Sequence, residues 1–419
     1  MLIADKLLLW RASAVLIGLC MPLIIVGKSV LGLVLLLGVM AGLMATKDES
    51  LRVTVKLLFN NAVTLLVVAF LLAATAGVLL GPLPLKAMDK WLQLILVALG
   101  AGLLFMTLRE MPGQALELLL QTLVVGILVL CGLTLLDALT GNVQLATALH
   151  GADKATSQYR LNFVSSVLAV LLPFLWARVY QQAREGELLA QRLALPAAAL
   201  GLFVLFVAGG RAGWVGGLVG LVAFVGLAGR YHGLTVHRRH WAAGLGLVLL
   251  ALLTYGFANG FEFMLNRVTI VGEAGVERGM LSGRGEVWQA ALAQLQAFTP
   301  AQWFYGVGVM NYRYLPGAVD LHPHNWPLQL LIETGALGFG IFCSLALLLL
   351  YRFWQYGRSN LYGVAAFASV AAFLVTGLAN TSIFRWDWLA LFAFAAILGY
   401  RTGWSRPDQK QRRKALKQA

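Results

Sequence analysis

Long apolar segments recur along almost the whole chain and limit what it can fold into. A helix needs about 20 mainly apolar residues to cross the hydrocarbon of a membrane, and apolar segments follow one another from residue 8 to residue 400. The twelve predicted spans are residues 8–26, 30–45, 57–80, 91–108, 114–136, 161–178, 193–208, 212–228, 241–258, 326–350, 361–380 and 385–400. We therefore expect an all-α polytopic membrane protein, with residues 1–419 forming a single integral membrane domain.

Composition supports this fold class. The chain is 60% hydrophobic and only 12% charged, and its mean hydropathy of +0.79 excludes a soluble globular domain. Cys20, Cys131 and Cys343 all fall inside predicted spans. Their positions give neither a disulfide framework nor a metal-ligand spacing, so we expect all three to pack in the core.

The net charge is +14, and the positive residues are distributed unevenly between the connections on the two sides of the predicted spans. If the C-terminus lies inside, the inner connections and the basic tail at 401–419 hold 21 of the 32 Lys and Arg residues, whereas the short outer connections hold seven. Positive residues stay on the cytoplasmic side of membrane proteins. The pattern predicts two cytoplasmic termini and argues against nucleic acid as a partner; the tail is then an orientation signal with some attraction to anionic lipid.

The longest interruption of the apolar pattern is the loop at 259–325, which we expect on the outer side of the membrane. A loop of this length between packed elements is uncommon and usually functional. Helical spacing from Glu286 to Phe298 predicts a short amphipathic helix within it, with Val287, Leu292 and Leu295 facing the membrane. The loop therefore contains local structure and carries part of the candidate site.

Arginines stand out in two places, one before this loop and the others within it. Arg211 lies between two apolar segments in Gly209-Gly210-Arg211, where a guanidinium costs roughly 2.5–3.5 kcal/mol unless it is paired or wetted. It either snorkels to the interface or binds an anion in an outward cavity. Arg284 opens the predicted amphipathic helix, where main-chain N–H groups attract anions, or it pairs locally with Glu286. Arg267, Arg278 and Arg313 are weaker signals.

The loop ends in His322-Pro323-His324-Asn325. Histidine has an unperturbed pKa of about 6.5, so neutral His324 is a usable proton acceptor. Asn325 is placed to orient the ring or a substrate hydroxyl, and His322 is the nearest rival as the base. Asp320, His322 and His324 also permit a metal site, although no fourth ligand has supporting spacing. Glu333, in the next span, is either a buried partner for an arginine or a polar contact to a sugar.

Taken together, these residues resemble the O-antigen ligase and polymerase superfamily of bacterial inner-membrane proteins. The resemblance rests on His324-Asn325 followed by Leu328-Gln329, Glu333 and Gly335-x-x-Gly338. Ser282-Gly283-Arg284 with Trp288, and Gly210-Arg211 at an outer helix end, support it. The arrangement of about twelve spans with one large periplasmic loop before the histidine is also similar.

The resemblance implies transfer of a glycan from undecaprenyl pyrophosphate to an acceptor at the periplasmic face. In the ligases the acceptor is the lipid A core, which completes lipopolysaccharide. We expect His324 to act as general base, with Arg211 and Arg284 stabilising the pyrophosphate and no metal or other cofactor required. The candidate substrate-binding residues are Asn325, His322, Glu333, Arg313, Arg267 and Arg160, the last with a secondary role.

Two alternatives stay open at this point. A polymerase or a protein O-oligosaccharyltransferase shares the motif and differs in its acceptor. In a different class, a lipid or solute transporter would place charge at the centres of its spans. The predicted span centres are almost free of charge, and the polar residues gather on one face. This asymmetry favours chemistry at the membrane surface.

Overall fold

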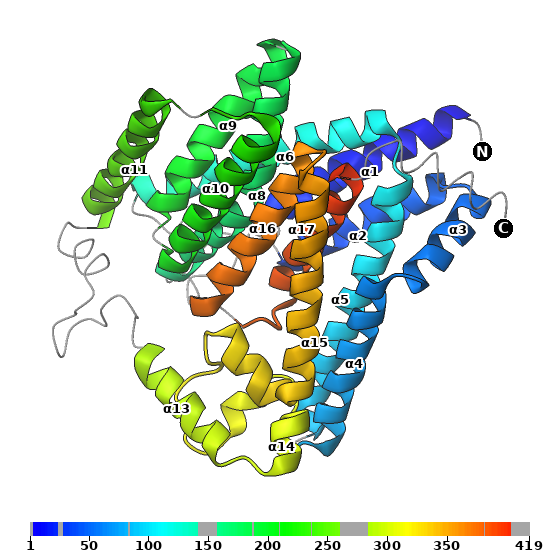
Figure 1. Ribbon diagram of the computed structural model, residues 1–419, viewed down its shortest axis with the longest axis vertical. Coiled ribbons are helices and arrows are strands. Elements are labelled where there is room, and N and C mark those ends of the chain that lie inside the picture. Colours follow the sequence, from blue (N-terminus) through cyan, green and yellow to red (C-terminus); the bar gives the residue numbers. More distant parts are fainter. Residues whose placement is uncertain are drawn as a thin grey trace.

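The computed structural model describes residues 3–23, 28–82, 84–140, 157–186, 188–208, 210–235, 237–259, 284–380 and 382–403. All regular elements in these ranges are helices (Figure 1). The elements are α1 (Ile3–Leu23), α2 (Lys28–Ala45), α3 (Asp48–Phe59), α4 (Ala62–Leu80), α5 (Pro84–Glu110), α6 (Gly113–Thr140), α8 (Ser157–Glu185), α9 (Leu188–Val207), α10 (Arg211–His232), α11 (Arg238–Asn259), α13 (Arg284–Gln296), α14 (Pro300–Tyr305), α15 (Trp326–Gly357), α16 (Leu361–Thr376) and α17 (Trp386–Gly403), with 3-10 turns η2 (Tyr312–Tyr314) and η3 (Gly377–Ala379).

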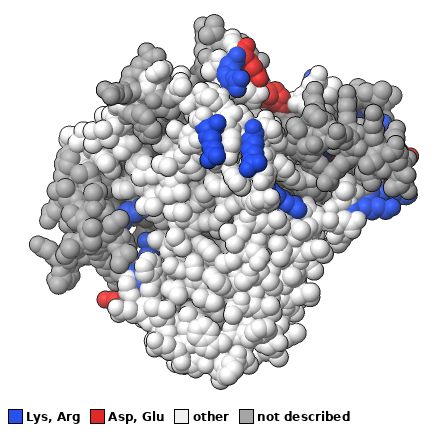
Figure 2. All heavy atoms as spheres, in the orientation of Figure 1, with Lys and Arg blue, Asp and Glu red and all other residues white. Residues whose placement is uncertain are grey.

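Length and hydropathy identify eight of the described helices as candidate membrane spans, or nine if the bent α2–α3 pair is one span. Two further apolar helices, Ala194–Val207 and Ala242–Thr254, are shorter. The all-α polytopic class is therefore confirmed, while the number of twelve spans stays a prediction. On the face in Figure 2, Lys and Arg lie mainly toward the upper end, above a broad uncharged surface.

Several predicted boundaries differ from the structure. The apolar stretch from 57 to 80 begins in a separate helix, because α3 bends by 118° from α2 and ends at Phe59. Asn61 then starts α4, its side chain accepting a hydrogen bond from Val63 N. The last helix continues to Gly403, so the basic tail predicted from Arg401 begins within α17. Residues 404–419 lie outside the described residues.

Helices α8 and α16 form the centre of the bundle. Residues 163–175 of α8 are all buried, and α10 packs against both helices. Small residues on α10 permit this close approach, since a Cβ at Gly216 would collide with the Thr376 hydroxyl. Packing of α10 on α8 and α16 places Arg211, the first residue of α10, at the end of the bundle where α16 leads into η3.

Helices α13 and α14 cover one end of the bundle, below α15 and α4 in Figure 1. The amphipathic helix that the sequence predicts is present as α13, and its buried residues are Val287, Ala291 and Leu295. Leu292 lies outside this buried row, with its side chain 49% exposed, and the membrane-facing orientation of the helix stays a prediction. The buried positions are four residues apart, and this row of the helix packs against α15.

A kink at Gly335 anchors the α14 region to α15. Gly335 has φ 64°, ψ −174° inside the helix. Because of this break, the carbonyls of Ile332 and Glu333 do not accept from the main-chain N–H groups four residues later, as they would in a regular helix. They accept instead from Val307 N at 2.9 Å and from Gly308 N at 3.0 Å. The predicted Gly335-x-x-Gly338 motif thus has a structural basis: the first glycine permits a conformation that a side chain would strain.

We expect Gly335→Ala to destabilise the protein, because alanine would adopt positive φ and its Cβ would collide with the Phe304 carbonyl. Strain of this kind costs about 1–3 kcal/mol. Gly340→Ala is the matched control, since a Cβ there meets nothing within 4 Å. Thermal unfolding in detergent should show a clear decrease in Tm for Gly335→Ala alone. Equal Tm values for the two variants would contradict this account of the kink.

Candidate active site

The loop that carries His324 is held by three hydrogen bonds from neighbouring residues. Asn325 caps α15 by accepting from Leu328 N at 3.1 Å, and its amide donates to the Leu378 carbonyl at 3.2 Å. From α13, Trp288 Nε1 donates to the Pro323 carbonyl at 3.0 Å. His324 itself has φ 53°, a left-handed conformation that is uncommon outside glycine. These contacts fix the ring against the turn that follows α16.

The two ring nitrogens of His324 have different partners. Nδ1 lies 2.9 Å from the Asn380 carbonyl, and Nε2 lies 3.1 Å from Asp320 Oδ2. A carbonyl oxygen can only accept, so Nδ1 carries a proton and donates it. In the neutral ring Nε2 is then the lone-pair nitrogen. Protonation of Nε2 would create a charge-assisted hydrogen bond to Asp320, so this carboxylate stabilises the state that forms after His324 takes a proton.

Burial and nearby positive charge favour the neutral form of both histidines. Burial and the Arg284 guanidinium lower the pKa of His324, against an opposing effect of Asp320. Burial and the adjacent His324 lower the pKa of His322 to about 4. The two rings lie edge to face with centroids 4.1 Å apart. Burial and Arg284 thus favour the neutral ring of His324, which can accept a proton, whereas the Asp320 carboxylate beside Nε2 favours the protonated ring.

Arg284 is the first residue of α13, as the sequence predicts, and it acts electrostatically on His324. Trp288 is four residues further along the same helix and bonds the loop next to His324. Residues four apart lie on one face of a helix. The face of α13 that holds the loop thus also carries Arg284 toward the imidazole.

The start of α10, which carries Arg211, is connected to the same region through main-chain and hydroxyl contacts. The carbonyl of Gly210, which caps α10, accepts from Ser165 Oγ at 3.1 Å. The neighbouring Ser166 hydroxyl accepts from the Asn380 amide at 2.7 Å. Asn380 in turn binds His324 through its carbonyl. The start of α10 and the imidazole are therefore attached to the same two elements, α8 and the turn after α16.

Two predicted substrate-binding residues have structural partners. Glu333 is fully buried, and Oε2 accepts from Met310 N at 2.6 Å. Arg313 interacts electrostatically with it and lies 4.7 Å from the Tyr314 ring centroid. The Gln329 amide also donates to Glu333 at 3.3 Å, and the two roles left open for this carboxylate, an arginine partner or a contact to a sugar, stay predictions. Asn325, whose side chain caps α15, likewise holds the loop.

Three predicted residues fall outside this description. Arg267 and Arg278 lie outside the described residues, and of Arg160 only the helical main chain is described. Their roles in substrate binding stay predictions.

Sequence reasoning missed Arg385 and underestimated Asp320. Arg385 lies 4.2 Å from the Phe163 ring centroid, pairs with the buried Asp387, and lowers the pKa of His322. The sequence placed it only in a short outer connection, because nothing local links residue 385 to residue 322. Asp320 appeared only as a possible metal ligand, whereas the structure shows it beside the His324 imidazole.

The metal alternative can be tested against this geometry. Ligand atoms of Asp320, His322 and His324 lie within 4.8 Å of one another, so three ligands are available to a divalent ion. Positive charge already surrounds the group, since Arg284 and Arg385 lower the pKa values of the two histidines. The same charge would repel a cation, which favours proton transfer as the role of His324.

The fold and this cluster define a polytopic membrane protein with a histidine–arginine site at one end of its bundle. Residues 196–343 match the family model described as O-antigen ligase. The match confirms the resemblance drawn from the motifs, and it contains Arg211, Arg284, Asp320 and His324. It also supports an enzymatic function of the glycosyltransferase type. No curated protein matches the chain.

We expect Asn325→Ala to lower the free energy of unfolding by about 0.5–2 kcal/mol, because it removes the cap of α15. Asn325→Asp keeps the oxygen that accepts from Leu328 N and should lose less. Chemical or thermal unfolding of the two variants distinguishes a cap from a substrate contact. If Asn325→Ala unfolded like the wild type, the capping role would be refuted.

Proposed function

We propose that the protein is an O-antigen ligase. It would transfer a glycan from undecaprenyl pyrophosphate to the lipid A core, with the active site at the periplasmic face of the bacterial inner membrane and both termini in the cytoplasm. The observation that carries this proposal is the His324 imidazole, on which the Arg284 guanidinium acts electrostatically, inside the matched family segment. Its Nδ1 is anchored to a main-chain carbonyl, which leaves Nε2 available for a proton.

The arginines suit a pyrophosphate leaving group. Negative charge grows on the pyrophosphate as the glycosidic bond breaks, and a guanidinium aimed at that charge stabilises the transition state more than the ground state. Arg211 and Arg284 each begin a helix, where main-chain N–H groups also attract anions. They would bind the two phosphates of the carrier, and a separate metal ion would not be needed.

His324 would act as general base on the acceptor. As the sugar hydroxyl of the lipid A core attacks the anomeric carbon, its proton moves to Nε2 of His324. The bond from that carbon to the pyrophosphate oxygen breaks, and the pyrophosphate leaves with the electron pair. Attack opposite the leaving group inverts the anomeric centre. Asp320 would stabilise the imidazolium that forms; general-base assistance of this kind typically contributes about 10²–10⁴-fold.

The acceptor distinguishes the ligase from its relatives. A polymerase would add the glycan to a second carrier-linked chain, and a protein O-oligosaccharyltransferase would add it to a protein hydroxyl. Each would use the same base and arginines. The short loop helices, without a further soluble domain among the described residues, favour a lipid acceptor.

Reconstituted protein supplied with carrier-linked glycan and lipid A core should form the joined product without added metal, also in the presence of a chelator. Mass spectrometry of the lipids identifies the product. His324→Ala should reduce turnover by at least about 10²-fold, because it removes the base. Lengthened carrier-linked chains would indicate a polymerase, and transport without a covalent product would indicate a transporter. Near-normal turnover by His324→Ala would refute the assignment of the base.

The pH profile tests the environment of His324. Only the neutral ring accepts a proton, so kcat/KM should fall as the pH decreases through its lowered pKa, below 6.5. Asp320 raises this pKa and Arg284 lowers it. Asp320→Asn should therefore move the acidic limb to lower pH, and Arg284→Gln should move it to higher pH. Shifts in the same direction, or no shift in either variant, would contradict this arrangement of charges.

A further inference from the structure

Gln329 belongs to the sequence motif that follows His324, and the function proposed above gives it no role. Its side chain is fully buried near the start of α15. The side-chain oxygen accepts from Ile383 N at 3.1 Å, and the amide nitrogen donates to Ser382 Oγ at 2.8 Å and to Glu333 at 3.3 Å. An amide whose acceptor and two donors all have partners is held in one orientation.

The chain between α16 and α17 is where Gln329 and the histidine loop meet. In this stretch the Leu378 carbonyl accepts from the Asn325 amide at 3.2 Å, and the Asn380 carbonyl lies 2.9 Å from Nδ1 of His324. The two residues that bond Gln329 follow within three positions of Asn380. A buried side chain of α15 therefore holds the same short stretch of chain that holds the imidazole.

The direction of the Asn380 carbonyl depends on contacts on both sides of it. The Asn380 side chain donates to Ser166 Oγ at 2.7 Å, which fixes the residue to α8. The carbonyl itself belongs to the planar peptide unit that follows Asn380, so it cannot rotate without moving the chain after it. Gln329 fixes that following chain at Ser382 and Ile383.

Two acceptors compete for the single proton of the neutral His324 ring. The Asn380 carbonyl lies 2.9 Å from Nδ1, and the Asp320 carboxylate lies 3.1 Å from Nε2. A proton on Nδ1 leaves the lone pair on Nε2, where the ring can accept a further proton. A proton on Nε2 would pair with Asp320 and leave no lone pair at that nitrogen. The base is therefore competent at Nε2 only while the carbonyl stays against Nδ1.

We propose that Gln329 is a positioning residue for the base. Through Ser382 and Ile383 it holds the Asn380 carbonyl against Nδ1 of His324, and so keeps the neutral ring in the tautomer whose Nε2 accepts a proton. Full burial strengthens these hydrogen bonds, because water does not compete for them. The effect on turnover rests on the function proposed above. The effect on the tautomer does not, so the two can fail separately.

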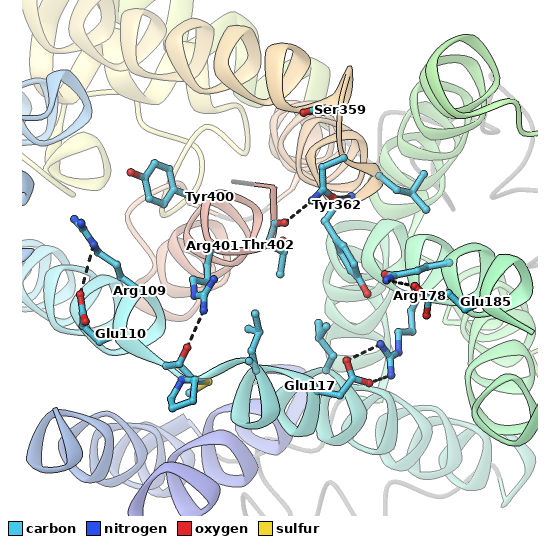
Figure 3. A pocket seen from close by; sticks show the side chains of 18 of the residues that line it. Arg109, Glu110, Glu117, Arg178, Glu185, Ser359, Tyr362, Tyr400, Arg401 and Thr402 are labelled. Atoms are coloured by element: carbon cyan, nitrogen blue, oxygen red, sulfur yellow. Dashed lines mark hydrogen bonds and ion pairs between the residues drawn. The ribbon is translucent and has the colours of Figure 1, made fainter. Parts of the chain in front are cut away.

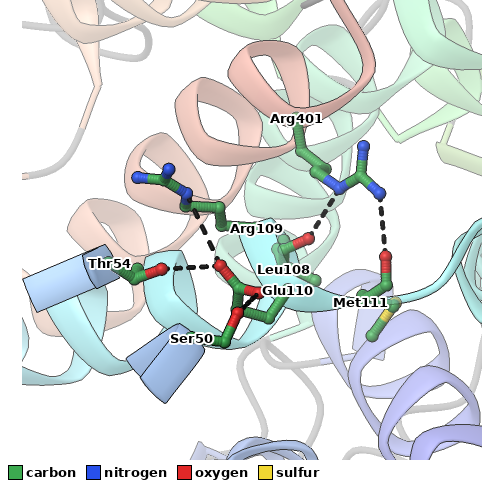
Figure 4. Close-up of polar contacts among 7 residues, drawn as sticks. All are labelled: Ser50, Thr54, Leu108, Arg109, Glu110, Met111 and Arg401. Carbon is green, nitrogen blue, oxygen red and sulfur yellow. Dashed lines mark hydrogen bonds and ion pairs between the residues drawn. The ribbon is translucent and has the colours of Figure 1, made fainter. Parts of the chain in front are cut away.

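The opposite ends of α16 and α17 provide a matched control. They border a polar pocket of about 1420 Å³ (Figure 3). There the Asn360 amide donates to the Thr402 carbonyl at 2.8 Å, and Arg401 donates to the carbonyls of Leu108 and Met111 (Figure 4). Helix α16 has 16 residues and is about 24 Å long. Asn360→Ala therefore loosens the same two helices far from the imidazole.

The first measurement needs no substrate. Solid-state NMR of full-length protein labelled with ¹⁵N-histidine, in lipid vesicles at a pH above the lowered pKa of His324, shows which ring nitrogen carries the proton. Comparison with His324→Ala identifies the signals. Wild type should carry the proton on Nδ1. Gln329→Met fills a similar volume without the hydrogen bonds and should move a large share of the proton to Nε2. Asn360→Ala should lower Tm and keep the wild-type signal.

The second measurement separates kcat from KM in glycan transfer. Gln329→Met should lower kcat by about 10–100-fold, the usual effect of removing a group that orients a histidine. KM for the carrier-linked glycan should stay within about threefold of wild type, since Gln329 does not contact the donor.

Ser382→Ala covers the case in which Gln329→Met does not fold. It removes one of the two bonds to the chain after Asn380 and should change the tautomer and kcat in the same direction, by less. A wild-type tautomer in both variants would overturn the proposal. The same tautomer change in Asn360→Ala would also overturn it, because loosening anywhere in the bundle would then have this effect. An altered tautomer with normal kcat would instead remove His324 as the base.

Discussion

The hydrogen bond from the His324 imidazole to the main-chain carbonyl of Asn380 joins the loop before α15 to the turn after α16. It determines which ring nitrogen carries the proton, and the other nitrogen then lies beside the Asp320 carboxylate. The same asparagine is fixed to α8 through Ser166, beside the Ser165 that bonds the cap of α10. Asn380 therefore contacts both the His324 ring and α8, and α8 also bonds the cap of α10. The position of the base and the position of the start of α10 thus depend on each other.

The scaffold that presents Arg284 depends on a different constraint. The kink at Gly335 exposes two carbonyls of α15, and the chain after α14 binds them through Val307 and Gly308. This attachment holds the covering layer on the bundle, and α13 then reaches the histidine loop through Trp288. Main-chain hydrogen bonds and one indole contact thus position this layer.

The fold class followed from hydropathy alone, because a helix in a bilayer must be long and apolar. The span boundaries did not follow from hydropathy, since α3, which bends away from α2, is held by contacts of Ser50 and Thr54 with Glu110, which is 60 and 56 residues away in the chain. In the site, local patterns identified His324 and Arg284. They could not identify Arg385, which lies over the Phe163 ring of α8 and has a small electrostatic effect on His322. Asp320 could be recognised as a partner of the His324 ring only from the conformation of the loop.

The central claim is that one imidazole and the arginines at two helix starts share a substrate. A cryo-electron microscopy structure with undecaprenyl pyrophosphate bound tests it most directly. The account predicts phosphate oxygens within hydrogen-bonding distance, about 3 Å, of the guanidiniums of Arg284 and Arg211. It also predicts that His324 Nε2 faces the same cavity. Pyrophosphate bound away from both arginines, or an imidazole turned from it, would contradict the account.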